Sequence, residues 1–150
     1  MAIRKVQEDP HPALRAKAKP IKVINERVRR QAADLADTLE SIDIGIGLAA
    51  NQVGLLWRMF VVRLPEDERA TIFINPEITE REGIQESNEG CLSCPGRNGI
   101  VERPQSVTIR AQDIGGNEFT LKAEGLRAAC ICHEYDHLDG ILFYDRVTTE

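Results

Sequence analysis

The sequence predicts an α+β fold in which antiparallel sheets pack around a central C-terminal helix, with an N-terminal helix on the outside. Three observations predict this class. Short β-branched and aromatic runs fill the middle of the chain, an amphipathic helical pattern precedes them, and one late helical pattern follows them. No internal repeat or low-complexity linker interrupts the 150 residues, so residues 1–150 are expected to form a single domain.

The N-terminal part is expected to be irregular first and helical afterwards. Three prolines lie within residues 9–22, which predicts an extended segment on the surface. A helix is predicted from Asn25 to Ser41, because Asn25 is a good N-capping residue and Val28 and Leu35 recur at helical spacing. This helix should pack its apolar face on the body of the domain.

Strands are predicted where β-branched and aromatic residues cluster or alternate. Met59–Arg63 and Thr71–Asn75 read as neighbouring strands, because a polar loop separates them, and Pro76 is expected to close the second. The other predicted strands are residues 78–84, a hairpin of residues 105–112 and 119–123, and a short strand at residues 141–143.

The last predicted helix runs from Gly125 to Leu138 and ends at the following Asp-Gly pair. Leu126, Cys130 and His133 recur at helical spacing, and His137 continues the same stripe. An apolar stripe of this kind faces the core, so both histidines are expected on the core side of the helix.

This helix contains an HExxH pattern, formed by His133, Glu134 and His137. On a helix, the i, i+4 spacing places both imidazoles on one face, close enough to bind one metal ion. A glutamate beside a metal-bound water can act as a general base. Taken alone, however, HExxH also occurs by chance on solvated helices.

Four cysteines, Cys91, Cys94, Cys130 and Cys132, form two tight pairs in an otherwise cysteine-free chain. In a reducing compartment such pairs indicate metal or redox chemistry. Cys91 is a candidate third ligand beside the two histidines. Two alternatives remain: a Cys91/Cys94 redox pair, disfavoured because no helix start follows, and a closed four-cysteine zinc site, disfavoured because sulfurs two residues apart on a helix point to different faces.

Residues 45–54 (GIGLAANQVG) are small and glycine-rich, which allows close approach of the backbone to a ligand or strand. The Lys-Ser/Thr ending of a phosphate loop is missing, so the local sequence favours a tight buried loop or strand. Gln52 is the exception. A carboxamide among small apolar residues needs a hydrogen-bond partner or a function.

Composition and charge exclude several classes of protein. The chain is 42% hydrophobic and 29% charged, has no apolar run as long as a membrane span, and starts without a secretory h-region, so a cytoplasmic protein without membrane association is expected. The net charge of −5 argues against direct nucleic-acid binding. Residues 1–30 carry nine Lys/Arg against three Asp/Glu, which indicates a solvated basic face or, as a weaker hypothesis, contact with an anionic partner such as a ribosome.

Three stretches of the chain together resemble the peptide deformylase family. Its motifs GxGLAAxQ, EGCLS and HExDH stand here as residues 45–52, 89–93 and 133–137, in the family order and at family-like separations. The resemblance covers nearly the whole chain. It implies a metal-dependent hydrolase that removes the N-terminal formyl group from formyl-methionyl nascent polypeptides and releases formate.

The resemblance also implies roles for individual residues. By analogy, Cys91, His133 and His137 bind one divalent metal ion, which is expected to be Fe²⁺ in the cell, with Zn²⁺, Ni²⁺ or Co²⁺ accepted in preparations. The catalytic groups are then Glu134 as general base, with the Gln52 side chain and the Leu92 backbone N–H as oxyanion donors. The substrate-binding residues are expected to be Gly45, Ile46, Gly47, Leu126 and Cys130.

Two features depart from the family pattern. Cys132 stands where the family usually has Gln, which removes a local polar contact and adds a thiol near the metal. The chain ends at Glu150, without the C-terminal helix that is linked to ribosome docking in bacterial members, so that docking route is not expected. Two other readings are a related hydrolase of another small acyl amide and an inactive binding homologue; intact Glu134 and Gln52 argue against the latter.

Overall fold

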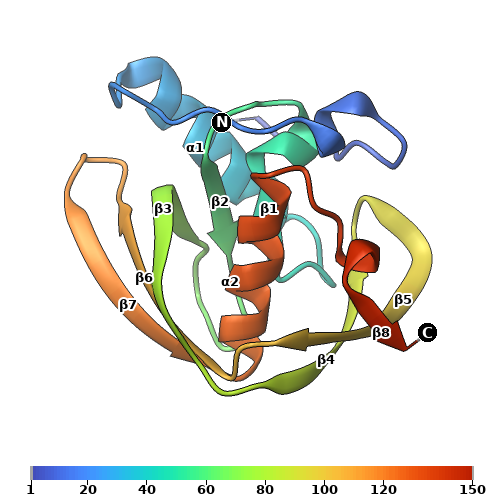
Figure 1. Cartoon of the computed structure of the whole chain (residues 1–150). Helices are drawn as coiled ribbons and strands as arrows, with labels where there is room; N and C mark the ends of the chain where they lie inside the picture. Colours follow the sequence, from blue (N-terminus) through green and yellow to red (C-terminus); the bar gives the residue numbers. More distant parts are fainter. Residues whose placement is uncertain (1, 150) are drawn as a thin grey trace.

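The computed structural model describes residues 2–149, and these residues form an α+β fold with antiparallel sheets, as predicted (Figure 1). The helices are α1 (Glu26–Glu40) and α2 (Leu126–His137). The strands are β1 (Gly47–Ala49), β2 (Met59–Val62), β3 (Thr71–Glu82), β4 (Gln85–Cys91), β5 (Cys94–Arg103), β6 (Ser106–Gln112), β7 (Glu118–Glu124) and β8 (Val147–Thr149). Short 3-10 helices lie at η1 (Pro12–Arg15), η2 (Ala50–Val53) and η3 (Phe143–Asp145).

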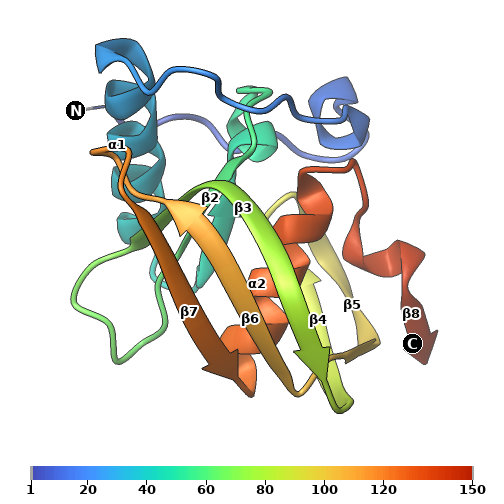
Figure 2. The same ribbon diagram turned by 60° about the vertical axis from the view of Figure 1, so that its left-hand side comes forward.

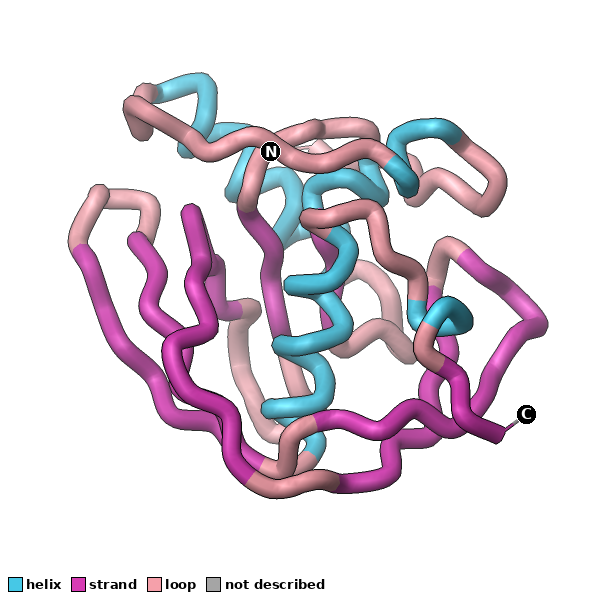
Figure 3. The backbone as a smooth tube through the Cα atoms, in the orientation of Figure 1, coloured by secondary structure: helices cyan, strands magenta, loops and turns pink. Residues whose placement is uncertain are grey.

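The strands form two sheets, one of five strands in the order β1-β2-β3-β6-β7 and one of three in the order β4-β5-β8. All pairs within the sheets are antiparallel. Helix α2 contacts β1, β2 and β7 of the larger sheet and β5 of the smaller one. Figure 2 shows α2 behind β3, β6 and β7, and Figure 3 shows strands on both sides of it. Helix α2 therefore contacts both sheets.

Helix α1 forms where it was predicted. Asn25 is its N-cap and accepts the backbone N–H of Val28 at 2.9 Å, which satisfies one of the free donors of the first turn. Val28, Leu35 and Leu39 are buried in a core cluster that includes residues of β1, β2 and β3. The helix contacts these three strands and lies away from the three-stranded sheet.

The predicted end of a strand at Pro76 is wrong, because β3 continues to Glu82 and absorbs the separate strand expected after it. The register against β6 shifts between Ile74 and Glu77, and Asn75 has a φ of 50°. Pro76 therefore lies in a bulge, where its missing N–H costs no ladder hydrogen bond.

The hairpin of β4 and β5 was not predicted as strands. Glu89 is the one buried side chain in β4, so the strand carries no apolar alternation that the sequence could reveal. Its main chain instead pairs with β5 from Gln85 to Cys91. The strand expected at residues 141–143 is also wrong, because Asp145 accepts the N–H of Leu142 and closes the turn η3 there.

Helix α2 has the predicted bounds, with Gly125 as its N-cap and Leu138 as its C-cap. Both histidines are buried, but Leu126 is 53% exposed, so the apolar stripe does not extend to the first turn. Cys132 packs in the core cluster that α2 forms with the larger sheet. Across the described residues, none of the helices combines the length and the apolar character needed to cross a membrane.

Candidate metal centre and active site

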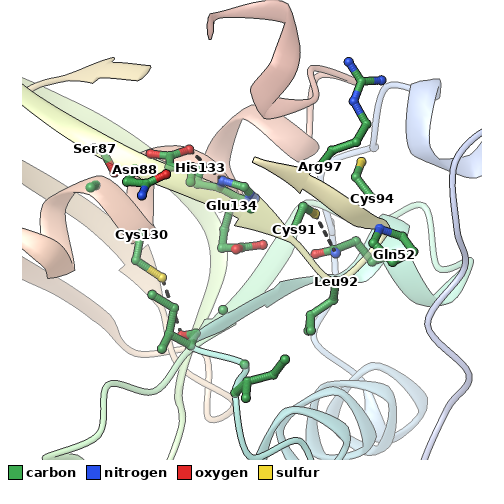
Figure 4. A pocket seen from close by; sticks show the side chains of 18 of the residues that line it. Gln52, Ser87, Asn88, Cys91, Leu92, Cys94, Arg97, Cys130, His133 and Glu134 are labelled. Carbon is green, nitrogen blue, oxygen red and sulfur yellow. Dashed lines mark hydrogen bonds and ion pairs between the residues drawn. The ribbon is translucent and has the colours of Figure 1, made fainter. Parts of the chain in front are cut away.

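A pocket of about 540 Å³ opens beside α2, between β1 and the β4–β5 hairpin (Figure 4). Most of the predicted site residues line it, although they lie far apart in the sequence. The predicted substrate-binding residues that line the pocket are Gly45, Ile46, Gly47, Leu126 and Cys130, and the predicted catalytic residues that line it are Gln52, Leu92 and Glu134.

Three side chains that could hold a metal ion converge beside this pocket, of which Cys91 and His133 line it and His137 lies outside its lining. The donor atoms of Cys91, His133 and His137 all lie within 4.8 Å of one another. Cys91 Sγ is 3.5 Å from His137 Nε2. A thiolate and two imidazoles within this distance match the donor set of a site for Fe²⁺ or Zn²⁺, so the residues fit a divalent ion.

His133 is oriented by an acid from the neighbouring hairpin. Glu89 Oε1 lies 2.9 Å from His133 Nδ1, so this nitrogen carries the proton and the Nε2 lone pair stays free for a metal. Arg103 in turn donates two hydrogen bonds to Glu89, at 2.8 and 2.9 Å. Burial alone would raise the pKa of Glu89, but these partners outweigh it and lower the pKa to about 2.

Arg103 is buried, so its pairing with Glu89 lies in the protein interior. Arg103 also donates to Asp136 at 2.8 Å, and Arg146 donates to the same carboxylate at 2.6 Å. Sequence reasoning missed Asp136 and Arg146, although Asp136 lies within the HExDH motif. Only the tertiary fold shows these partners.

Glu134 is a buried carboxylate at the pocket wall, and its Oε1 has no partner among the described residues. Burial raises its pKa to about 7. A Cβ atom on Gly47 would lie 2.6 Å from Glu134 Oε2 and 2.9 Å from Cys130 Sγ. A side chain at position 47 would therefore require the Glu134 carboxylate or the Cys130 thiol to shift.

Gln52 has the partners that its burial demands. Its Oε1 accepts the backbone N–H of Ala49 at 2.8 Å, and its Nε2 donates to Ser93 Oγ at 3.0 Å. Nε2 also lies 3.6 Å from Cys91 Sγ, so the amide group points at the candidate metal ligands. Ser93 is a contact that sequence reasoning missed, although it ends the EGCLS motif.

The protein alone favours the neutral forms of two candidate ligands. Burial lowers the pKa of His137 well below its usual value, so the imidazole is neutral and able to ligate. The contact with Cys94, with burial adding to it, raises the pKa of Cys91. A divalent cation would oppose this effect by stabilising the thiolate, so metal binding should release a proton.

The closed four-cysteine site is wrong. Cys130 Sγ lies 3.5 Å from the carbonyl oxygen of Ile46, and Cys132 packs in the core outside the pocket. Burial raises the pKa of Cys132 to about 11, so it remains a thiol. The extra thiol that the departure from Gln introduces is therefore a core residue and does not line the pocket.

The family model of polypeptide deformylase matches residues 3–150. The chain belongs to the peptide deformylase family. It is 46% identical over 145 residues to peptide deformylase 1 of Clostridium perfringens, covering 97% of this chain and 98% of the relative. It is 48% identical over 147 residues to the Caldicellulosiruptor bescii peptide deformylase, covering 98% and 87%.

Solved structures of peptide deformylases share the fold. The crystal structure from Thermotoga maritima superposes with a TM-score of 0.92 at 32% identity, covering 99% of each chain. That from Synechococcus elongatus, in complex with actinonin, has a TM-score of 0.91 at 38% identity, covering 98% of this chain and 80% of the other. The peptide deformylase class that the three motifs predicted is confirmed.

Proposed function

We propose that the chain removes the formyl group from N-formyl-methionyl nascent polypeptides and releases formate, with one divalent metal ion bound by Cys91, His133 and His137. The convergence of these donor atoms within 4.8 Å, next to the buried carboxylate of Glu134, carries the proposal. Fe²⁺ is the ion we expect in the cell, and Zn²⁺, Ni²⁺ and Co²⁺ suit the same ligands. In this proposal residues 1–150 act as one cytoplasmic domain with α2 as its central element.

The proposed reaction is hydrolysis of the formyl amide by water. When bound, the metal supplies a Lewis acid that polarises the formyl carbonyl group and lowers the pKa of a water molecule. Glu134 accepts a proton from the attacking water and later delivers it to the leaving amine nitrogen. The water oxygen ends in formate, and the peptide leaves with a free amino terminus. A pKa of Glu134 near 7 suits both directions of proton transfer.

The proposed oxyanion donors are Gln52 Nε2 and the backbone N–H of Leu92. Each such donor typically contributes about 3 kcal/mol to the stability of the transition state. The hydrogen bond from the Ala49 N–H to Gln52 Oε1 fixes the amide group, so its NH₂ end points toward the cluster. This arrangement provides a preorganised donor.

We propose that the peptide binds along Gly45, Ile46 and Gly47, which precede and begin β1, as an added strand. Leu126 and Cys130 line the same pocket and would contact the methionine side chain. N-formylated nascent peptides are the partners in this proposal. Contact of the basic N-terminal segment with the ribosome is a secondary part of it.

The test is formate release from a formyl-Met peptide by protein loaded with Fe²⁺ or Ni²⁺. We expect release by the wild type, and a roughly 10²–10⁴-fold lower kcat for Glu134→Gln with unchanged metal content. Glu124→Gln, on the exposed face of β7, is the matched control and should behave as the wild type.

Two results would contradict the proposal. Acetate release from an acetyl-Met peptide, without formate release from a formyl-Met peptide, would indicate a hydrolase for another acyl amide. Full activity of Glu134→Gln would remove Glu134 from the proton transfer. Inhibition by actinonin, which is present in the Synechococcus elongatus deformylase structure, provides an independent check of the pocket.

A further inference from the structure

Cys94 is a thiol that the proposed mechanism does not use. It begins β5, is 4% exposed, and lies in the wall of the same pocket as Cys91. It is free and is not among the metal-ligating group. A buried cysteine often behaves as a small apolar residue, so its position relative to Cys91 decides whether it has a chemical role.

Cys91 and Cys94 lie opposite each other at the tip of the β4–β5 hairpin. Leu92 and Ser93 form the turn between them, and the two cysteines are register partners. Antiparallel partners have Cα atoms about 4.5–5.5 Å apart, which falls inside the roughly 4.4–6.8 Å range of disulfides. Side chains of residues directly opposite each other on an antiparallel pair lie on the same face, so the two cysteines project to one side of the hairpin.

The local structure holds this pair in place and separates it from the other thiols. The backbone carbonyl of Ser93 accepts the N–H of Asp9 at 2.8 Å, and its hydroxyl accepts a hydrogen bond from Gln52. Figure 4 shows Cys94 on the Cys91 side of the pocket, whereas Cys130 lies on the other side of Glu134. Cys94 is therefore the thiol placed to react with Cys91.

We propose that Cys91 and Cys94 are an oxidation site for peroxides, in which Cys94 resolves oxidised Cys91 to an intramolecular disulfide. The Cys91 thiolate attacks one peroxide oxygen, which gives a sulfenic acid and breaks the O–O bond; with hydrogen peroxide, the leaving hydroxide becomes water. The Cys94 thiol then attacks the Cys91 sulfur, forms the S–S bond and expels a second water. Two electrons pass from the thiols to one peroxide.

The disulfide would reversibly inactivate the site. This consequence rests on the proposed role of Cys91 as a metal ligand, because a disulfide sulfur is no longer a thiolate donor and two histidines remain. A dithiol reductant restores both thiols, after which metal can bind again. Without Cys94, the sulfenic acid would proceed to sulfinic and sulfonic acids, which a dithiol does not reduce.

The experiment treats Ni²⁺-loaded protein with stoichiometric hydrogen peroxide and then blocks free thiols with N-ethylmaleimide. Intact mass and peptide mapping should show a product 2 Da lighter than the reduced protein before alkylation, with Cys91 linked to Cys94. A chromogenic chelator should detect released metal, and dithiothreitol should restore metal binding. These readouts do not depend on deformylase activity, so they separate this inference from the proposed function.

Both Cys94→Ser and Cys94→Val remove the resolving thiol. The serine variant keeps the size of the side chain, and the valine variant keeps its apolar character. Both should lose the linked product and accumulate Cys91 carrying two or three oxygens, with no recovery in dithiothreitol. Cys132→Ala, which removes a similarly buried thiol from the core, should behave as the wild type. A wild type without the Cys91–Cys94 link, or Cys94 variants that recover fully, would overturn the inference.

Discussion

At the scale of single residues, the missing side chain of Gly47 determines where the buried carboxylate can lie. A Cβ atom at this position would come within 2.6 Å of Glu134 Oε2, a separation that real Cβ atoms do not show. Glu134 Oε1 is also buried and has no hydrogen-bond partner among the described residues. The absence of a side chain at Gly47 thus provides space for the carboxylate of the proposed base.

Gly47→Ala should therefore displace the Glu134 carboxylate and lower kcat, because a shift of about 1 Å at a reacting group can cost roughly 10²-fold in rate. Metal content should stay unchanged, since the atoms nearest an added Cβ belong to Glu134 and Cys130 and not to a proposed ligand. Gly115→Ala, in the exposed turn between β6 and β7, is the control. Steady-state kinetics with a formyl-Met peptide decide, and an unaffected kcat for Gly47→Ala would contradict the steric argument.

The proposed role of Gln52 can be tested by a substitution that keeps the acceptor Oε1 and removes the donor Nε2. Gln52→Glu keeps an oxygen for the Ala49 N–H but has no amide to donate. We expect kcat to fall roughly 10²–10³-fold, as for loss of an oxyanion donor. Ser93→Ala, which removes only the hydroxyl that Gln52 contacts, should have a much smaller effect. If Ser93→Ala costs as much as Gln52→Glu, the Gln52 effect is one of positioning and not of donation.

Residue-level prediction from the sequence succeeded where a side chain contradicts its surroundings. Gln52 is a carboxamide among small apolar residues, and this anomaly is visible without a structure. The hydrogen bond between Glu89 and His133 was not predicted, because it joins residues 44 positions apart. Local sequence contains no information about which element will lie opposite such a side chain.

At the scale of elements, a chain of ion pairs joins helix α2 to the three-stranded sheet. Arg103 on β5 contacts Glu89 on β4 and Asp136 on α2, and Arg146 contacts Asp136 from outside. Arg103 and Glu89 are almost completely buried. Each charge therefore depends on its partner, because a lone buried charge is poorly solvated.

Arg103→Met should destabilise the fold by about 3–5 kcal/mol, the usual cost of removing one partner from a buried pair. Urea unfolding followed by circular dichroism measures this loss. Arg110→Met removes a half-exposed arginine that pairs with Glu77 on the sheet surface, and it should cost no more than about 1 kcal/mol. Equal losses in the two variants would show that the buried chain of ion pairs gives no special stability.

The pH dependence of stability can be tested at the other end of α2. Two hydrogen bonds from Arg127, in the first turn, lower the pKa of Asp67 below its ordinary 3.8. A lowered folded-state pKa gives stability that is present above the unfolded pKa and is lost as pH falls through the folded one. Asp67→Asn should thus be less stable than wild type at pH 7, by about 1 kcal/mol.

Below about pH 4, where the unfolded Asp67 is protonated, this difference should shrink as the folded carboxyl also titrates. Denaturant midpoints measured from pH 7 to pH 2.5 show the trend. Asp113→Asn, in the exposed turn after β6, serves as a carboxylate control. A difference between wild type and Asp67→Asn that stays constant across this range would contradict the ion-pair explanation.

Helices and strands were predictable where burial of one face gives the apolar residues a regular spacing in the sequence. Helix α1 and the β6–β7 hairpin bury one face, so their apolar spacing marks them. Strand β4 was not predicted, because its backbone pairs with β5 while Glu89 is its one buried side chain, so its sequence shows no apolar alternation. The bulge at Pro76 was not predicted, because it depends on the register with the partner strand β6.

At the scale of the whole molecule, the proposed metal links two parts of the fold. Cys91 ends β4 in the smaller sheet, whereas His133 and His137 lie on α2, which also packs on the larger sheet. A ligand that binds the folded state alone stabilises it by RT ln(1 + [L]/Kd), about 1.4 kcal/mol for each tenfold excess over Kd. Metal should therefore support the global fold as well as the chemistry.

Removing the metal with a chelator should lower Tm, and adding Ni²⁺ or Zn²⁺ should restore it in proportion to the logarithm of metal concentration. Scanning calorimetry at several metal concentrations measures this dependence. Cys91→Ser loses the thiolate and should lose most of the concentration dependence. If the Tm of the wild type changes with neither chelator nor added metal, the three side chains do not bind the ion in the native state.

The fold class was predictable because strand and helix patterns occupy separate stretches of the chain, and the family was predictable because three motifs resemble those of peptide deformylases. The strand order β1-β2-β3-β6-β7 was not predictable. It requires residues 85–103 to leave this sheet and form a separate one, and nothing in their sequence indicates that. Two spatial facts, the register pairing of Cys91 with Cys94 and the hydrogen bond of Arg103 to Asp136, appear only in the folded structure.

The sequence separation between Cys91 and the α2 histidines has a consequence for biosynthesis. A ribosome releases the β4–β5 hairpin before α2 has been made, so for some time Cys91 has no imidazole partners. Closing a loop of more than forty residues must precede assembly of all three donors. If the three side chains bind metal as proposed, metal insertion comes late in folding, after a stage in which the Cys91 thiol lacks the two α2 histidines.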